Sequence, residues 1–200
     1  GIGKTRLAAE VARRARGAGF EVFVGRSIDL VGTELPYLPF AEAFRPLGEP
    51  WRAARRAAGS QLGVFEATLA LLSGRAAAAP VLLVLEDLHW ADTSTLDLVV
   101  FLTHNLHERP VLLLATCRAD EPASAARMRR LAEGVRRSGS ALVLELGPLG
   151  RDELTALLAA RAGASLPAAV TDTIVARSEG NPFFAEELLA AADDGGGELP

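Results

Sequence analysis

Residues 81–87 are Val81-Leu82-Leu83-Val84-Leu85-Glu86-Asp87, an unbroken apolar run that ends in two acids. Continuous hydrophobicity over this length is typical of a parallel strand that is covered on both faces. A second apolar run, Val111–Thr116, follows Pro110 and predicts another buried strand. Segments with helical periodicity lie between the apolar runs. This alternation predicts an α/β fold, a parallel sheet with helices on both faces.

The other expected elements follow the same alternation. Leu7, Val11 and Ala15 recur at four-residue spacing and predict a helix over Thr5–Arg16. Four prolines are expected to break residues 26–60 into a loop and short helices. The remaining expected strands are Glu21–Gly25 and Ala141–Leu146, and the remaining expected helices are Ala41–Leu47, Trp51–Ala58, Leu62–Gly74, a helix capped by Ser94 with Asp97, and Pro122–Arg137.

The chain starts with Gly1-Ile2-Gly3-Lys4-Thr5, directly before the first expected helix. Lys4 is the only lysine among 21 basic residues, so this position favours an ammonium where the chain otherwise uses guanidinium. A phosphate-binding loop (Walker A) explains the choice, because its glycines bring backbone N–H groups to phosphates, its lysine reaches the β- and γ-phosphates, and its Thr hydroxyl ligates Mg²⁺. A chance Gly-Lys-Thr is the alternative.

The full pattern G-x-x-x-x-G-K-[ST], anchored on Gly3 and Lys4, places its first glycine before residue 1. The strand that feeds the loop is expected upstream as well. We therefore expect the three-layer α/β fold of a P-loop NTPase, with a parallel sheet whose first strand is truncated in this chain.

Polar side chains follow the two apolar strands. Glu86-Asp87 end one strand and Arg118 follows the other, and ligands of open parallel sheets bind beyond these carboxyl ends. One acid would orient Mg²⁺ near the Thr5 hydroxyl, and the other would polarise the attacking water (Walker B). Successive strand residues point to opposite faces, so Glu86 and Asp87 are expected to divide these roles. Which acid does which is left open, as is the alternative of two solvated acids.

Two further segments have both a structural and a functional interpretation. Arg118 is placed to contact a γ-phosphate, or it is an exposed arginine that opens a loop. In the segment that follows the acids, Trp90 is expected to pack under the rim of the sheet and Asp92 to cap the next helix.

After Gly147-Pro148 the sequence predicts helices alone. We expect domains over residues 1–147 (core), 148–192 (helical subdomain) and 193–200 (linker). Gly180 is expected to end one helix, Asn181 to cap the next and Pro182 to occupy its first turn, with Phe184 and Leu188 on the buried face. The expected helices are Arg151–Arg161, Pro167–Arg177 and Pro182–Ala192.

Bulk properties exclude some classes of protein. The net charge of −4 gives no overall attraction to nucleic acid, and the apolar runs are too short to cross a bilayer. The single cysteine excludes an internal disulfide framework and fits a reducing compartment. We expect a cytoplasmic protein that does not contact the membrane.

These segments together resemble the ATPase domain of the large LuxR-type transcriptional regulators, which belongs to the signal-transducing (STAND) class of AAA-like P-loop ATPases. The resemblance covers nearly the whole chain. It runs through Gly1-Ile2-Gly3-Lys4-Thr5-Arg6-Leu7, residues 35–43, Val81–Asp92, Ala115-Thr116-Cys117-Arg118, and Glu179-Gly180-Asn181-Pro182-Phe183-Phe184-Ala185-Glu186-Glu187-Leu188.

The resemblance implies roles for particular residues. Gly1–Arg6 would bind ATP or ADP, with Thr5 and the acid pair at Mg²⁺. Arg118 would sense the phosphates, and Pro182, in the helical subdomain, would lie near the adenine. Many family members have Asp-Asp where this chain has Glu86-Asp87, which puts the division of labour between the acids in doubt.

The resemblance also implies a switch that rests with ADP and is active with ATP, often by self-association, with DNA bound by a domain outside this chain. Two other functions stay open. A motor or loader ATPase with steady turnover would need an arginine supplied in trans by a neighbouring subunit. The arginine cluster at 127–137 is the candidate. A scaffold would bind nucleotide without hydrolysing it.

Overall fold

The computed structural model describes residues 2–29, 35–118, 122–137, 139, 141–163 and 166–194. Contacts between Cα atoms divide the chain into two compact units. The larger unit is Leu7–Val143, and the smaller unit combines Gly1–Arg6 with Leu144–Pro200.

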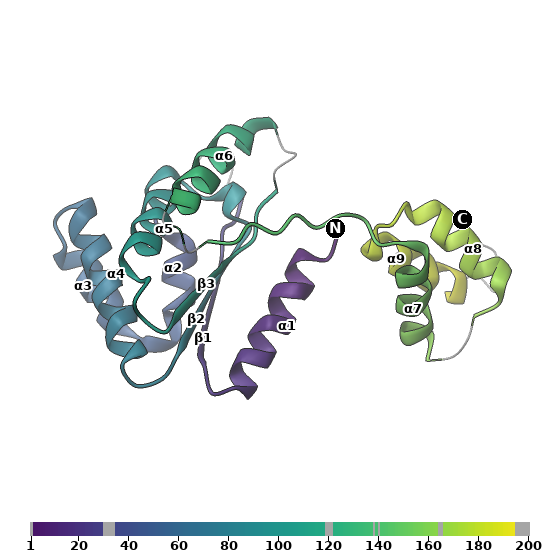
Figure 1. Cartoon of the computed structure of the whole chain (residues 1–200), viewed down its shortest axis with the longest axis horizontal. Coiled ribbons are helices and arrows are strands. Elements are labelled where there is room, and N and C mark those ends of the chain that lie inside the picture. The colour runs from purple at the N-terminus through teal and green to yellow at the C-terminus, as the bar shows by residue number, and fades with distance from the viewer. Residues whose placement is uncertain are drawn as a thin grey trace. The chain divides into compact units, whose positions relative to one another are not determined.

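The larger unit is built on a parallel sheet of three strands (Figure 1). The strands are β1 (Glu21–Arg26), β2 (Val81–Glu86) and β3 (Val111–Ala115), in the order β1-β2-β3. Arg26 is the register partner of Glu86, and Ala115 is the partner of Leu85. All three strands therefore end at the same edge of the sheet, as the sequence predicted for residues that follow β2 and β3.

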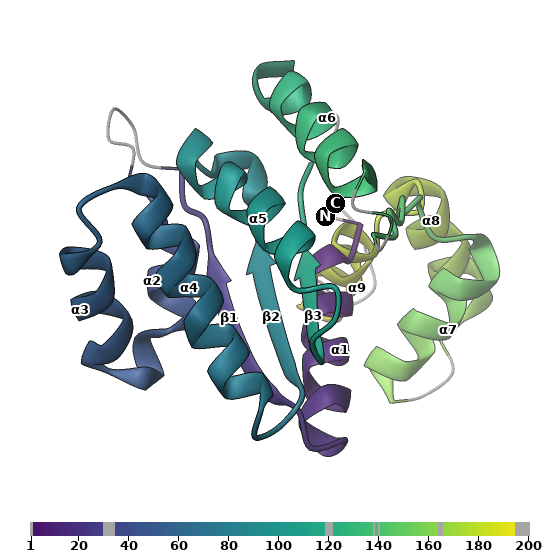
Figure 2. The same ribbon diagram turned by 60° about the vertical axis from the view of Figure 1, so that its left-hand side comes forward.

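Helices lie on both faces of the sheet (Figure 2), and alternate residues of β2 belong to two different hydrophobic clusters. Leu82 and Val84 pack against Ala8 and Ala12 of α1 (Lys4–Gly17). Leu83 and the other odd-numbered residues of β2 belong to the core on the opposite face. The helices that contribute to that core are α2 (Leu38–Ala43), α3 (Glu49–Ala57), α4 (Gln61–Ala76), α5 (Thr93–Asn105) and α6 (Pro122–Arg137). The expected α/β architecture with helices on both faces is confirmed.

The helices after β1 begin earlier than the sequence predicted. Instead of helices over Ala41–Leu47 and Trp51–Ala58, the chain forms α2, a 3₁₀ turn at Arg45–Leu47 (η1), and α3. Each of these three elements has a proline in its first two positions. Proline is tolerated there because the first N–H groups of a helix have no intrahelical acceptor. The prolines therefore start helices where we expected them to interrupt the segment.

The cap of α5 also differs from one of the two predictions. Asp92, and not Ser94, is the N-cap residue, and its carboxylate accepts a hydrogen bond from Thr95 N at 3.0 Å. Asp92 Oδ2 also accepts from the Thr95 hydroxyl and lies 3.4 Å from Tyr37 N. The Ser94–Asp97 pattern was misleading because these side chains lie inside the first turns of the helix.

The strand predicted at Val111–Thr116 forms as β3, but its expected burial is wrong, and the strand predicted at Ala141–Leu146 does not form. β3 is an edge strand, and Leu112 is 52% exposed, so this strand is not covered on both faces. Residues 141–150 form no strand, and Leu142 and Leu144 are 80% and 67% exposed. A strand needs a neighbour to pair with its backbone groups. No described strand supplies one for Ala141–Leu146.

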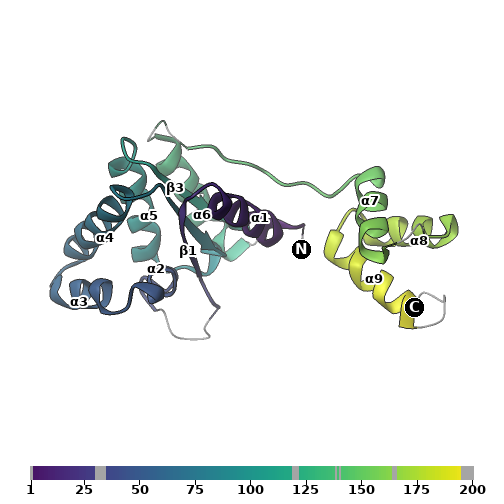
Figure 3. The same ribbon diagram turned by 90° about the horizontal axis from the view of Figure 1, so that it is seen from below.

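The smaller unit contains α7 (Arg151–Ala162), α8 (Ala168–Ser178) and α9 (Pro182–Asp194), close to the three predicted helices (Figure 3). Its core includes Leu158, Ile174 and Leu188. Phe184 is 45% exposed, so the prediction that it shares the buried face with Leu188 was wrong. Asn181 Oδ1 accepts hydrogen bonds from Phe183 N and Phe184 N, as expected of a cap.

A substitution at Gly25 of β1 would test how closely α2 packs against this strand. A Cβ atom at Gly25 would lie 1.8 Å from Pro39 O and 2.9 Å from Ala43 N. We expect Gly25→Ala to lower the free energy of unfolding by roughly 3 kcal/mol, the upper end for overpacked sites. Gly74→Ala is the matched control: Gly74 lies inside α4 with nothing within 4 Å of its Cβ position, and alanine there should raise stability by ~0.5–1 kcal/mol. Urea denaturation that ranks the two variants equally would contradict this packing.

Candidate active site

The first turn of α1 contains the residues of the expected phosphate loop. Gly3 has a φ of 94°, a backbone conformation that favours glycine, and the helix begins at the next residue, Lys4. The first N–H groups of α1 have no acceptor within the helix, and together with the helix dipole they favour an anion. Lys4 is half-buried, while Thr5 and Arg6 are exposed. Gly1 lies outside the described residues.

Within the smaller unit, the loop residues contact α9. A Cβ at Gly3 would lie 3.9 Å from Pro182 Cγ. Arg6 Nη1 lies 3.2 Å from Glu186 Oε1, which also accepts a hydrogen bond from Arg161 Nε at 3.0 Å. Sequence reasoning missed Glu186, because it was one of several acids on an expected helix.

The acid pair lies at the carboxyl end of β2. Glu86 is the last residue of the strand and is 5% exposed. Asp87 follows in the left-handed conformation (φ 57°, ψ 41°), which is uncommon for a residue other than glycine. Thr116 holds this turn: its hydroxyl accepts a hydrogen bond from Asp87 N at 3.1 Å, and its carbonyl accepts one from Leu88 N at 2.9 Å. Thr116 thus connects the ends of β2 and β3.

Arg26 is the cation of this site, and sequence reasoning missed it. Its Nε donates to Glu86 Oε2 at 3.0 Å, its Nη2 donates to the same oxygen, and its Nε lies 3.7 Å from Asp87 Oδ2. The hydrogen bond to Glu86 raises the pKa of the Arg26 guanidinium above its ordinary value. Its position opposite Glu86 follows from the register of β1 and β2. That register depends on which strands are neighbours, which the sequence alone does not specify.

Arg118 is three residues past the end of β3 and is exposed. It forms no hydrogen bond or ion pair with any other described residue. Its guanidinium is accordingly available to a ligand at the edge where β2 and β3 end.

The segment after the acid pair forms a 3₁₀ turn, η2 (Leu88–Trp90), before α5. Arg127 of α6 donates hydrogen bonds to the carbonyl oxygens of Ala91 and His89 at 3.2 and 3.4 Å. Of the cluster at 127–137, Arg127 therefore has a structural partner in this unit. Trp90 is 37% exposed and does not pack fully under the rim, whereas Asp92 caps α5 as one prediction stated.

The described residues contain no cluster of three His, Cys, Asp or Glu side chains that could hold a metal ion by themselves. Within the larger unit, the carboxylates of Glu86 and Asp87 are ligands of the kind that Mg²⁺ uses, one or two at a time, together with phosphates and waters. No helix in the described part of the chain has the length and apolar character needed to cross a bilayer.

Comparisons with known proteins give one family. The AAA ATPase domain matches residues 1–114, which include the phosphate loop, Arg26 and the acid pair. No curated protein matches the chain significantly.

The pairing of Arg26 with Glu86 can be tested without a ligand. Arg26→Leu leaves a buried carboxylate without its cation, which costs about 3–5 kcal/mol for a fully buried pair. Because the Arg26 side chain is 51% exposed, we expect the smaller loss of about 1–2 kcal/mol in urea denaturation. The loss should shrink when Glu86→Gln is already present. Arg75→Leu is the control and should cost under about 1 kcal/mol, because the side chain of its partner Glu21 is 27% exposed, against 6% for Glu86. Equal losses in the presence and absence of Glu86→Gln would show that the two side chains are not coupled.

Proposed function

Because the chain belongs to the AAA ATPase domain family, we propose that it is the ATP-binding, slowly hydrolysing switch domain of a signal-responsive transcriptional regulator of the LuxR type, in the STAND class. The observation that carries the proposal is the start of α1. A glycine in the left-handed conformation is followed at once by Lys4 and by the free N–H groups of a helix start. This arrangement is suited to a triphosphate.

The phosphates contact the chain through residues 1–6. Backbone N–H groups of Gly1, Ile2 and Gly3 donate to phosphate oxygens, and the Lys4 ammonium binds the β- and γ-phosphates. The Thr5 hydroxyl is an Mg²⁺ ligand. The direction of α1 within the larger unit supports this role: a turn of three residues, 18–20, joins its C-terminus to β1, so residues 7–17 run opposite to the strand.

The two acids differ in their surroundings, and this difference suggests how they divide the work. Glu86 is buried and held by Arg26, so its carboxylate is fixed at the end of β2, which suits a group that orients Mg²⁺. The Asp87 side chain is 30% exposed, and its nearest described cation lies 3.7 Å away. Asp87 is therefore the better candidate for the group that polarises the attacking water. Mg²⁺, when bound, neutralises charge that develops on the phosphates.

Arg118 and Pro182 are the proposed sensors. Arg118 is exposed beyond β3 without a described partner, so it is free to bind the γ-phosphate. Pro182 begins α9 of a helical subdomain, which we place at residues 148–192 between the core (1–147) and a linker (193–200). Its proximity to Gly3 supports a place for it near the nucleotide.

A switch requires ATP and ADP to bind two arrangements of the protein with different affinities. Arg118 would contact ATP through a phosphate that ADP lacks. The ATP state would self-associate, and DNA would be bound by a domain outside this chain.

Lys4→Ala tests phosphate binding. In the full-length protein we expect ATP affinity to fall roughly 10- to 100-fold, the effect of losing one charge-assisted interaction. Arg16→Ala, which removes an exposed cation from the other end of α1, should leave affinity unchanged. Isothermal titration calorimetry measures both. If Lys4→Ala binds ATP as tightly as the unaltered protein does, the proposal is wrong.

The acid pair separates binding from hydrolysis. Asp87→Asn should lower kcat by about 10²–10⁴, the usual contribution of a general base, while ATP still binds. Steady-state turnover of the unaltered protein should stay below about 1 s⁻¹, since productive phosphoryl-transfer enzymes reach ~1–100 s⁻¹. A much higher rate would favour the motor or loader ATPase. If the unaltered protein produces ADP only at the background rate, and Asp87→Asn and Glu86→Gln do not change that rate, the domain is a scaffold.

A further inference from the structure

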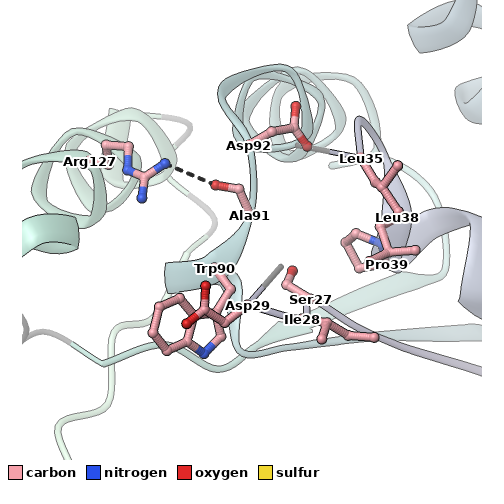
Figure 4. A pocket seen from close by; sticks show the side chains of 10 residues that line it. All are labelled: Ser27, Ile28, Asp29, Leu35, Leu38, Pro39, Trp90, Ala91, Asp92 and Arg127. Carbon is pink, nitrogen blue, oxygen red and sulfur yellow. Dashed lines mark hydrogen bonds between the residues drawn. The ribbon is translucent and has the colours of Figure 1, made fainter. Parts of the chain in front are cut away.

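A pocket of about 220 Å³ opens beyond the carboxyl end of β1, beside the turn that follows the acid pair (Figure 4). None of the residues assigned above to nucleotide or Mg²⁺ lines it. In Figure 4, Arg127 points at the Ala91 carbonyl from one side, and Leu35, Leu38 and Pro39 line the opposite side. The other lining residues are Ser27, Ile28, Asp29, Trp90 and Asp92.

The pocket contains a buried polar atom that the described protein does not satisfy. Ser27 is 3% exposed, and its Oγ has no hydrogen-bond partner among the described residues. A buried hydroxyl without a partner costs about 1–3 kcal/mol relative to a paired one. Its position in the wall of a cavity indicates that a ligand can supply the missing bond.

The charges of the pocket favour a cation. Asp29 is exposed, and its carboxylate forms no hydrogen bond or ion pair with any described residue. Asp92 adds a second carboxylate, which already caps α5. Arg127 is the one cation among the lining residues that the structure describes, and two of its N–H groups are used by the carbonyl oxygens of Ala91 and His89. Two carboxylates and one guanidinium give the described lining a net charge of −1.

Three of the apolar lining residues are open to solvent. Trp90 is 37% exposed, Ile28 is 53% exposed and Leu35 is 47% exposed. The buried His89 ring lies beside that of Trp90, with their centroids 4.7 Å apart. A ligand for this pocket therefore combines an apolar stem with a cationic head.

We infer that the pocket binds an arginine side chain from an exposed segment of a partner protein. A guanidinium is planar, so it stacks on the face of Trp90 while it donates two parallel hydrogen bonds to Asp29. The Ser27 hydroxyl accepts a further bond, and the aliphatic stem covers Ile28 and Leu35. A lysine ammonium is more strongly hydrated and cannot stack in this way.

The site lies on the same turn as the acid pair. Trp90 N donates to Asp87 O at 2.9 Å, so a partner that restrains Trp90 also restrains the backbone of Asp87. This regulatory consequence rests on the proposed function, whereas the binding itself does not.

The two tryptophans of the chain provide the test, because each has a distinct indole N–H signal in NMR spectra of the ¹⁵N-labelled protein. Trp51 is 2% exposed and donates to Thr68 Oγ1 at 3.1 Å, so it is an internal reference. We expect Nα-acetyl-L-arginine amide to shift the Trp90 signal saturably and to leave the Trp51 signal in place. Nα-acetyl-L-citrulline amide, which has a similar shape but no charge, should shift neither.

Variants sharpen the test in the same titration, without nucleotide. Asp29→Asn should weaken binding about two- to fivefold, as expected for a partly exposed ion pair. Ser27→Ala should weaken binding without lowering the melting temperature, because the hydroxyl has no bond to lose. Glu66→Gln, an exposed acid on α4 outside the pocket, is the control and should change nothing.

Three results would overturn the inference. Trp90 that stays unshifted at tens of millimolar ligand would show that the pocket is not an arginine site. Equal binding of the citrulline compound would show that charge is not recognised. Free arginine that binds at least tenfold more tightly than its blocked amide would show a site for the amino acid instead of a protein side chain. Because nucleotide takes no part in the titration, each result is independent of the proposed ATPase function.

Discussion

The burial of β2 on both faces is the constraint on which the chemistry of the larger unit depends. All six of its residues are buried, between α1 on one face and the larger core on the other. A strand in this position tolerates no unpaired charge along its length, because transfer of a charge from water is costly. Its single carboxylate, Glu86, stands at the last position, and Arg26 from the neighbouring strand supplies the counter-charge. The polar site is thus confined to one edge of the sheet, and its cation is set by strand register.

The turn beyond that edge links the acid pair to the rest of the unit. Asp87 is in the left-handed conformation, and Thr116 at the end of β3 fixes it through two hydrogen bonds. Residues other than glycine hold such conformations mainly where the surrounding structure enforces them, and often at functional sites. A few residues later, Arg127 of α6 donates hydrogen bonds to backbone carbonyl oxygens of the same turn. The acids are therefore positioned by β1, β3 and α6 together.

The hydrophobic pattern was sufficient to predict the buried elements. It was insufficient where contacts with distant parts of the chain determine the local structure. β2 and α1 were predicted within one or two residues, because continuous and four-residue apolar spacings each fit one kind of element. Ala141–Leu146 has the composition of a strand, but strand formation depends on a partner that composition does not reveal. Arg26 was missed for a similar reason, since only the pairing of β1 with β2 brings it to Glu86. Asp92 was a better cap than Ser94 because its carboxylate reaches Thr95 and Tyr37 together, a contact between residues 55 positions apart.

The pocket and the acid pair share one structural element, and this has a thermodynamic consequence. The turn from Asp87 to Asp92 contains the proposed water-polarising acid at its start, Trp90 of the pocket in its middle, and the cap of α5 at its end. If a ligand at one end favours one arrangement of this turn, a ligand at the other end experiences the same bias, because coupling between binding sites is reciprocal. A partner arginine that strengthens ATP binding would itself be bound more tightly in the presence of ATP. In such a switch, the partner arginine and the nucleotide would not need to contact each other, because the turn from Asp87 to Asp92 would connect their two sites.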